Sequence, residues 1–573
     1  MLAFFLVFVV IAVMQYFLPK PQPQQQQKAS DQQQQLKKQE QNTPAAPRTT
    51  INQPKASTRP ASAKLPVKQA SAESETVLEN DLYKITFTNH GALVKSWILK
   101  KYKDDKGHPL DLVNAITAPS LGYPLSFFSY DKDLENKLNN ALYVTSGMGT
   151  SEAPLTFQYS DGELTATKTF RPDNKYIISA EMQVTRGGQT ATAYPQWPGA
   201  TGDQATPGAF ASSRIDWNQN GSIERKPPTS GNFITGKKWL ANGQTINGPF
   251  QWAALVDQYF AVAFMPASPD STALVTFNNQ LEVPRNPANP GDTTKDKAPV
   301  LGLALGTTSG STRLRIFAGP KAVDLLETTQ AQPGGPDLRG ILDFGFFGFI
   351  AKPLFLWLKW TFEHWIPNWG WAIAFLTLVI TMALLPLRIS SQKSALKMQK
   401  IQPQVKSITE KYKRYSITDP RRQEMQKEMS ELYKREGVNP VGGCFPMLLQ
   451  MPFLFAFYSM LGNAIELRQA PWLWIKDLSA PDPTHILPIA IVITMFVMQK
   501  STPQAGMDPA QQKMLNLMGP LMIGGISWGV ASGLCVYWAI SNLLGFVQQL
   551  FLNRSELAQQ VRKSQERRAT RKR

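Results

Sequence analysis

The side chains that most often carry catalysis are few and scattered in this sequence. Four histidines form no metal-ligand cluster: His90, His108, His364 and His485. Residues 76–337 contain no Gly-x-Ser-x-Gly nucleophile elbow and no Gly-x-x-x-x-Gly-Lys-Ser/Thr phosphate loop. Both cysteines, Cys444 and Cys535, lie in apolar runs, so we interpret them as packing residues rather than a redox pair. We predict no metal, no cofactor and no enzymatic activity.

The net charge of +18 is concentrated in three stretches. Residues 1–75, 388–440 and 553–573 carry +5, +7 and +6, and the segments between them are neutral. Basic blocks suit anionic partners such as lipid headgroups or ribosomal RNA. A solvated linker or tail is the alternative, and we favour it for residues 1–75.

Residues 1–19 are expected to form an N-terminal transmembrane anchor. Met1–Leu18 is apolar apart from Gln15 and Tyr16, and it lacks a convincing small-x-small cleavage site. An uncleaved anchor is therefore favoured over a signal peptide. The Gln- and Pro-rich tract at 20–75 has too little apolar surface to offset chain entropy, which predicts a disordered tether.

Residues 76–337 alternate apolar and polar positions over short stretches bounded by turn residues, which predicts one all-β sandwich domain. Its expected strands include Leu82–Asn89, Leu164–Arg171, Tyr176–Arg186, Ala273–Asn278 and Arg313–Ala318.

Residues 338–370 are rich in aromatic side chains interspersed with Lys352, Lys359 and Glu363. Amphipathic rings prefer the headgroup level of a bilayer, so we predict an interfacial helix lying on the membrane. A buried aromatic core is the alternative. The aromatic residues are Phe344, Phe346, Phe347, Phe349, Phe355, Trp357, Trp360, Phe362, Trp365 and Trp369, and Trp371 follows directly.

Five apolar segments follow and predict, with the anchor, six transmembrane helices. They cover 371–387, 441–465, 486–500, 513–530 and 534–553, and Ala531-Ser532-Gly533 is the expected turn between the last two. The positive-inside rule places the basic segments 388–440 and 553–573, and the short loop 501–512, in the cytoplasm. Both termini are then inside, and the β domain and loop 466–485 are periplasmic.

The segment 388–440 has helical periodicity and predicts a cytoplasmic hairpin of two helices. Asp419-Pro420 is a helix start signal, and Pro403 is expected to kink or interrupt the first helix. Apolar positions recur at spacings of three and four: Met398, Ile401, Val405, Ile408 and Tyr412, then Met425, Met429 and Leu432.

Three strings in this region carry a specific resemblance. They are NPVGGCFPMLLQMP at 439–452, ELRQAP at 466–471 and DLSA at 477–480. They closely resemble the third span and following loop of the YidC/Oxa/Alb family, and the likeness extends over 365–553. The anchor, tether and β domain are similar in layout to Gram-negative members.

The resemblance implies a membrane protein insertase of the bacterial inner membrane. The fold would be a polytopic α-helical protein with a periplasmic β-supersandwich and five core helices around a hydrophilic groove. Its implied partners are nascent membrane proteins, the Sec translocon, the ribosome, the signal recognition particle pathway and the phospholipid bilayer. We assume a monomer.

The resemblance also implies groove residues. Thr377, Gln450, Met451 and Trp538 align with family positions that line the groove or touch the substrate. For Gln450 an interhelical hydrogen bond, and for Trp538 ordinary packing, are equally good interpretations.

The family's groove arginine would fall at Thr381, which is uncharged. Arg388 lies seven residues further, about 10.5 Å along a continuous helix and near the same face. We hypothesise that Arg388 partly substitutes at the groove mouth, although an ordinary inside anchor is the simpler interpretation.

Two rival functions remain on sequence grounds. Coupled transporters usually place ionisable residues in mid-membrane and often show repeated halves, and neither occurs in these core spans. A periplasmic assembly scaffold or receptor would use the β domain but would leave the cytoplasmic hairpin without a role.

The basic tail gives a first prediction. Arg567, Arg568, Arg571, Lys572 and Arg573 suit ribosomal RNA through phosphate neutralisation. Deleting 556–573 should reduce ribosome cosedimentation at low salt, and the difference should shrink as salt is raised. Unchanged cosedimentation would leave the tail as a plain flank of the last span.

Overall fold

The computed structural model describes residues 66–104, 106–173, 175–230, 238–287, 291–415, 419–438, 445–501, 509–555 and 559. The chain divides into two compact units, 1–62 and 63–573, and the described residues all belong to the second. The predicted anchor and most of the tether therefore lie outside the described residues. So do Cys444, Arg567, Arg568, Arg571, Lys572 and Arg573.

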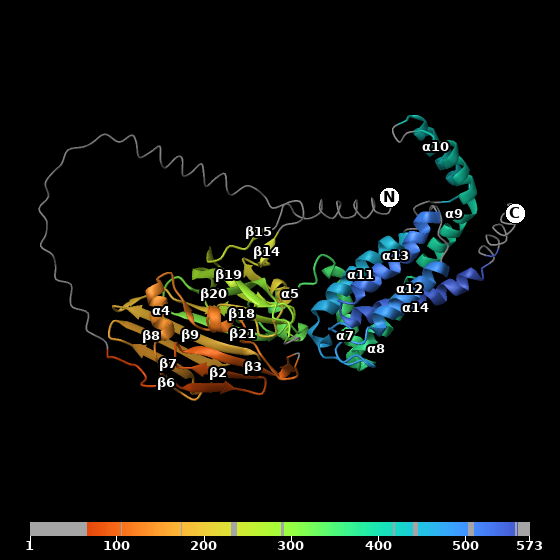
Figure 1. Ribbon diagram of the computed structural model, residues 1–573. Helices are drawn as coiled ribbons and strands as arrows, with labels where there is room; N and C mark the ends of the chain where they lie inside the picture. The colour runs from red at the N-terminus through yellow and green to blue at the C-terminus, as the bar shows by residue number, and fades with distance from the viewer. Residues whose placement is uncertain are drawn as a thin grey trace, which may run out of the picture. The chain divides into compact units, whose positions relative to one another are not determined.

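The first part of the described chain is built from antiparallel sheets (Figure 1). A four-stranded sheet contains, in this order, β1 (Glu75–Glu79), β2 (Tyr83–Thr88), β3 (Leu93–Lys103) and β4 (Pro109–Asp111).

The largest sheet has ten strands. Nine of them follow one another in the order β13 (Ser222–Lys226), β12 (Arg214–Gln219), β17 (Phe250–Val256), β18 (Phe260–Pro266), β21 (Thr312–Pro320), β9 (Ile177–Arg186), β8 (Leu164–Pro172), β7 (Leu155–Ser160) and β6 (Val144–Ser146), and β10 (Gln189–Thr190) pairs with β9. A five-stranded sheet runs β16 (Gln244–Asn247), β19 (Thr272–Pro284), β20 (Lys295–Thr307), β11 (Tyr194–Trp197) and β5 (Phe127–Phe128). A two-stranded sheet pairs β14 (Thr229–Ser230) with β15 (Lys238–Trp239).

This region is β-rich rather than all-β. Short helices join its strands: α3 (Ala118–Leu121), α4 (Lys132–Asn140), α5 (Pro207–Ala211) and α6 (Val323–Thr328). The alternation that predicted strands is visible in β8, where buried and partly exposed residues alternate from Leu164 to Phe170. The three larger sheets share one apolar core, in which Trp97 of β3 lies 6.0 Å from Trp197 of β11 between ring centroids.

Lys168 of β8 is a charged residue placed inside that core, fully buried. Its Nζ donates to the carbonyl oxygens of Gly91 (2.9 Å), Ala92 (3.0 Å) and Leu125 (2.7 Å). It also lies 4.2 Å from the ring centroid of Phe127. Burial lowers the pKa of Lys168 well below its usual value. One side chain thus satisfies three main-chain acceptors that have no water available.

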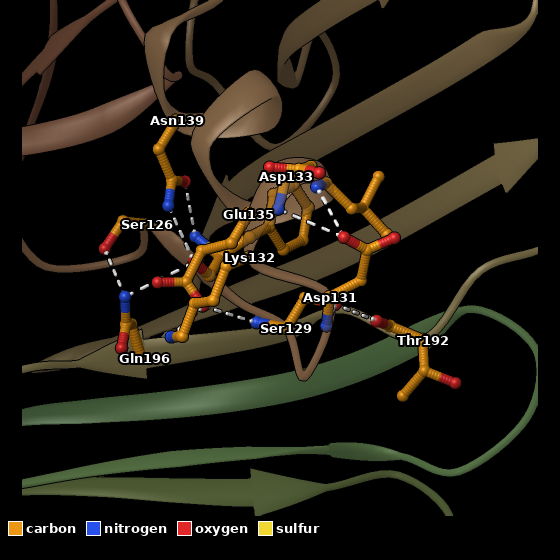
Figure 2. A network of polar contacts seen from close by, with 11 residues as sticks. Ser126, Ser129, Asp131, Lys132, Asp133, Glu135, Asn139, Thr192 and Gln196 are labelled. Atoms are coloured by element: carbon orange, nitrogen blue, oxygen red, sulfur yellow. Dashed lines mark hydrogen bonds and ion pairs between the residues drawn. The ribbon is translucent and has the colours of Figure 1, made fainter.

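Helix α4 is fastened to the sheets by the polar network in Figure 2. The carboxylate of Asp131 caps the helix by accepting from the amides of Asp133 and Leu134. Asn139 pairs with the main chain of Phe127 in both directions, at 2.8 and 2.7 Å. The network positions a helix and contains no element that suggests catalysis.

The second part of the chain is helical (Figure 1). Its helices are α7 (Gly348–His364), α8 (Trp369–Ala383), α9 (Leu385–Lys411), α10 (Arg421–Arg435), α11 (Phe445–Asn463), α12 (Ile486–Ser501), α13 (Pro509–Ser527) and α14 (Ser532–Asn553). Helices α8, α11, α12 and α14 contribute to one apolar cluster that also includes α7. The break between α13 and α14 lies at 528–531, so Ser532 and Gly533 begin α14 instead of forming the predicted turn.

Length and apolar composition support fewer membrane spans than the sequence predicted. Among the described residues, α14 alone is long and apolar enough to cross a bilayer, and α8 with α9 counts as a second only as one span bent by 55°. The apolar stretch Ile486–Gln499 is shorter. The prediction of six spans therefore stays a prediction.

Helices α7, α9 and α10 can be compared with their sequence patterns. Helix α7 buries Ala351, Leu354, Phe355 and Leu358 and exposes aromatic rings on the other side, among them Phe349 and Trp360. Helix α9 continues through Pro403, so the expectation that this proline interrupts the helix is wrong. Helix α10 begins directly after Asp419-Pro420, and the carboxylate of Asp419 accepts from the amide of Arg421 at 2.9 Å.

Replacing Lys168 tests its importance for the core. Lys168→Met keeps the side-chain length but leaves three buried carbonyl groups without a donor, so the free energy of unfolding should fall by about 3 kcal/mol. Urea denaturation of the full chain in detergent, followed by tryptophan fluorescence, measures this change. The matched control is the exposed Lys84→Met on β2, for which we expect a change below about 0.5 kcal/mol. Equal effects of the two substitutions would contradict the assignment.

Candidate functional site

Three helices bring polar side chains together within the helical region. Arg388 comes from α9, Gln450 from α11 and Tyr537 from α14. The Arg388 Nη2 donates to Gln450 Oε1 at 2.9 Å, and the Gln450 Nε2 donates to the Tyr537 hydroxyl at 2.6 Å. These residues are 62 and 87 positions apart, so only the tertiary fold creates the chain of hydrogen bonds. We call this group the polar site.

Arg388 reaches the polar site because the chain bends before it. Helix α8 ends at Ala383, and α9 begins at Leu385 with Pro386 in its first turn, at an angle of 55°. Proline lacks the amide needed inside a helix but is well suited to a first turn, so a new helix starts here. The expectation that Arg388 continues the helical face of Thr381 is therefore wrong, because the two residues belong to different helices.

Tyr537 connects the polar site to the apolar cluster. Its ring stacks on Phe457 of α11 with centroids 4.2 Å apart and planes inclined by 15°. Tyr537 itself is 3% exposed, and its neighbours Cys535 and Val536 are fully buried. The hydroxyl group thus lies at the boundary between tightly packed apolar side chains and the polar groups of Arg388 and Gln450.

Arg388 also passes close to the backbone of α14. A Cβ added to Gly545 would lie 3.9 Å from its Nη1 and 3.2 Å from the sulfur of Met498. An added Cβ would make only ordinary contact with the guanidinium, and Met498 of α12 would be the tighter neighbour. A planar guanidinium in this position can hold a carboxylate through two parallel hydrogen bonds.

The remaining sequence-predicted residues differ in their surroundings. Thr377 and Thr381 are buried in helix packing rather than placed on an exposed surface, and Thr377 Oγ1 donates to the carbonyl oxygen of Ile373 at 2.7 Å. Met451 and Trp538 are half-buried and adjoin Gln450 and Tyr537 along the chain. Tyr537 was not predicted as a site residue, although a phenol inside the charge-free stretch 514–553 is a usable signal.

Comparison with known proteins covers most of the described chain. Residues 75–357 match the family model described as YidC periplasmic domain, and 361–560 match the model described as 60Kd inner membrane protein. A relative from Geobacter sulfurreducens, named membrane protein insertase YidC, is 32% identical over 504 residues, covering 82% of this chain and 85% of its own. The chain belongs to the YidC family of membrane protein insertases.

Two further similarities accompany this assignment. A YidC relative from Wolinella succinogenes is 36% identical over 403 residues, covering 70% of this chain and 66% of its own. A crystal structure titled as an active YidC insertase with its first transmembrane domain resolved covers 85% of this chain and 94% of its own, at 17% identity and a TM-score of 0.34. Family members of this type carry the β domain in the periplasm, which agrees with the charge distribution of the sequence.

The burial of the site residues predicts how water reaches them. In a Cys444→Ser background, Gln450→Cys should react with a membrane-impermeant thiol reagent added from the cytoplasmic side about tenfold faster than Thr377→Cys, because only the first side chain is partly exposed. Native Cys535 is fully buried and supplies the unreactive baseline. Protection of Gln450→Cys in a protein that still supports growth would exclude water access at the polar site.

Proposed function

We propose that this chain inserts membrane proteins into the inner membrane and guides polar stretches of a client past the polar site formed by Arg388, Gln450 and Tyr537. The observation that supports this role most directly is the guanidinium of Arg388 held among helices by neutral partners, at 2.9 Å from Gln450. Family membership supports insertion over solute transport or periplasmic scaffolding.

The physical basis is the cost of polar groups in lipid. A charged residue at the bilayer centre costs about 2.5–3.5 kcal/mol on translocon scales, so the polar flank of a client opposes its own insertion. A hydrophilic groove that begins at the polar site shortens the distance over which this cost applies. No nucleotide is required, because burial of the client's apolar segment supplies the driving force.

The surrounding elements suit this role. In our proposal the exposed rings of Phe349 and Trp360 on α7, and of Trp365 directly after it, lie at the headgroup level. Six spans then place both termini in the cytoplasm. The α9–α10 hairpin and the basic tail would then face ribosomes delivering clients through the signal recognition particle pathway. The protein would act as a monomer, alone or beside the Sec translocon.

Replacing Arg388 tests the proposal. Arg388→Ala should lower insertion of a client with an acidic translocated tail by about tenfold, since one charge-assisted hydrogen bond contributes roughly 1.4 kcal/mol. A client with a neutral tail should be affected less, and Arg388→Lys should be intermediate because it keeps the charge without the planar fork. Protease protection of the translocated tail in cells or vesicles measures insertion.

The matched control is Lys393→Ala, an exposed residue one and a half turns further along α9. It removes the same charge outside the polar site and should leave insertion unchanged. Equal insertion of the acidic client by wild type and Arg388→Ala, at equal protein levels, would remove the proposed role of this arginine.

A further inference from the structure

The loop between α11 and α12, residues 464–485, contacts the β domain through several polar groups. We call it the outer loop. Directly before the loop, at the end of α11, Gly462 accepts at its carbonyl oxygen from Gln258 Nε2 of the β domain at 2.7 Å. Further along, Gln469 Nε2 donates to the carbonyl oxygen of Lys103 at 3.1 Å. These contacts join segments separated by 204 and 366 positions, so the outer loop connects the two halves of the described chain.

Arg468 is the central group of this junction. Its guanidinium lies 5.5 and 5.2 Å from the ring centroids of Tyr259 and Phe260, and 3.8 Å from Asp203 Oδ2. The side chains of Arg468 and Asp203 are only 7% and 14% exposed. A cation so far from water needs a nearby anion, and the β domain supplies it. A cavity of about 210 Å³ adjoins the pair.

Asp203 has a second carboxylate beside it. Asp257 Oδ1 accepts from the amides of Tyr259 (2.7 Å) and Phe260 (2.5 Å), and its other oxygen accepts from the Thr201 hydroxyl. Burial and the charge of Asp257 raise the pKa of Asp203 well above its usual value, and Arg468 opposes this shift. The charge of Arg468 therefore offsets only part of the effect that burial and Asp257 have on the pKa of Asp203.

Glu466, two residues before Arg468, forms a second acidic group of the outer loop. It is largely withdrawn from solvent, and burial raises its pKa to about 7. The groups that face it are Lys359 of α7, Asp324 of α6 and the main chain of Val323, and Tyr102 of β3 lies nearby. Lys359 Nζ also forms ion pairs with the carboxylate of Asp324 and with Glu363 Oε1, the latter at 3.6 Å.

We propose that the outer loop is a latch between the β domain and the membrane helices, closed by Arg468 and the buried carboxyl groups of Glu466 and Asp203, and held more tightly as the surrounding medium becomes acidic.

The direction of the pH effect follows from the raised pKa values of Glu466 and Asp203. A carboxyl group with a higher pKa in the closed latch binds more protons there than in the open one, so protons favour closure. For Glu466 this contribution is complete below about 4.5 and is lost as pH rises through about 7. Lys321, whose pKa burial lowers to about 8, stays protonated in this window, as does Lys359 with its raised pKa.

Distance measurement between spin labels tests the latch in the full chain. Lys101→Cys on β3 and Lys476→Cys on the outer loop are exposed labelling positions, used in a Cys444→Ser background in phospholipid nanodiscs. The ratio of closed to open molecules should be about tenfold higher at pH 5.5 than at pH 7.5, because Glu466 titrates in this range while Lys321 stays largely protonated. An identical distance distribution at both pH values would overturn the proposal.

Replacing the carboxyl groups by neutral amides of the same shape separates the effect of their titration from the general stability of the closed latch. Glu466→Gln should hold the closed distance at both pH values. Asp203→Asn is the second variant, for use where Glu466→Gln is poorly produced, and it should weaken the pH dependence. The matched control is Glu363→Gln, an exposed carboxyl group on the other side of Lys359, which should keep the pH dependence. Arg468→Gln should open the latch at both pH values. A full pH dependence retained in Glu466→Gln and Asp203→Asn would also overturn the proposal.

Discussion

Arg388 carries a permanent positive charge into a group of largely apolar helices, where a guanidinium is stable only if other groups replace its lost water. Gln450 provides an amide oxygen, and its amide nitrogen continues the hydrogen-bond chain to Tyr537. One side chain from each of α9, α11 and α14 is therefore fixed by the same requirement. The bend before Leu385 belongs to this arrangement, because it turns the start of α9 toward α11.

The other end of the helices is organised by main-chain contacts. The amides of Ser532 and Gly533 at the start of α14 donate to the carbonyl oxygens of Ala480 and Leu478 in the outer loop, both at 2.8 Å. Trp472 packs on Gly370 of α8 so closely that an added Cβ would lie 2.1 Å from its ring. The outer loop thus spaces α8 and α14 by backbone geometry, while side-chain polarity determines the contacts at the polar site.

Local patterns in the sequence predicted local structure well. Alternation predicted β8 and β9 closely, and the Asp419-Pro420 signal placed the start of α10 correctly. The break between α13 and α14 was placed two to three residues late, because several small residues there suit a turn equally well. The bend at Leu384 was missed, although Pro386 is a known signal for a first helical turn.

The polar site was harder to predict, since its members meet only through tertiary packing. The resemblance to a family predicted Gln450 as a groove residue, but it pointed equally to Thr377 and Thr381, which are buried between helices. Arg388 was singled out by its charge, and the argument for its position assumed a straight helix. Contacts across 62 and 87 residues depend on how helices are tilted, and no periodicity in one segment contains that information.

The two arginines illustrate how a family fold can use the same side chain in opposite ways. Arg468 faces the carboxyl group of Asp203, so its charge is compensated within the protein and stabilises a junction. Among the residues that the structure describes, Arg388 donates to the neutral amide of Gln450, which in turn donates to the phenol of Tyr537, and neither group cancels the charge of the guanidinium. In a low-dielectric surrounding an uncancelled charge attracts an anion over a longer distance than in water. In the proposed function the polar site must release each client, so this attraction has to be available without being permanently satisfied, and neutral partners meet both conditions.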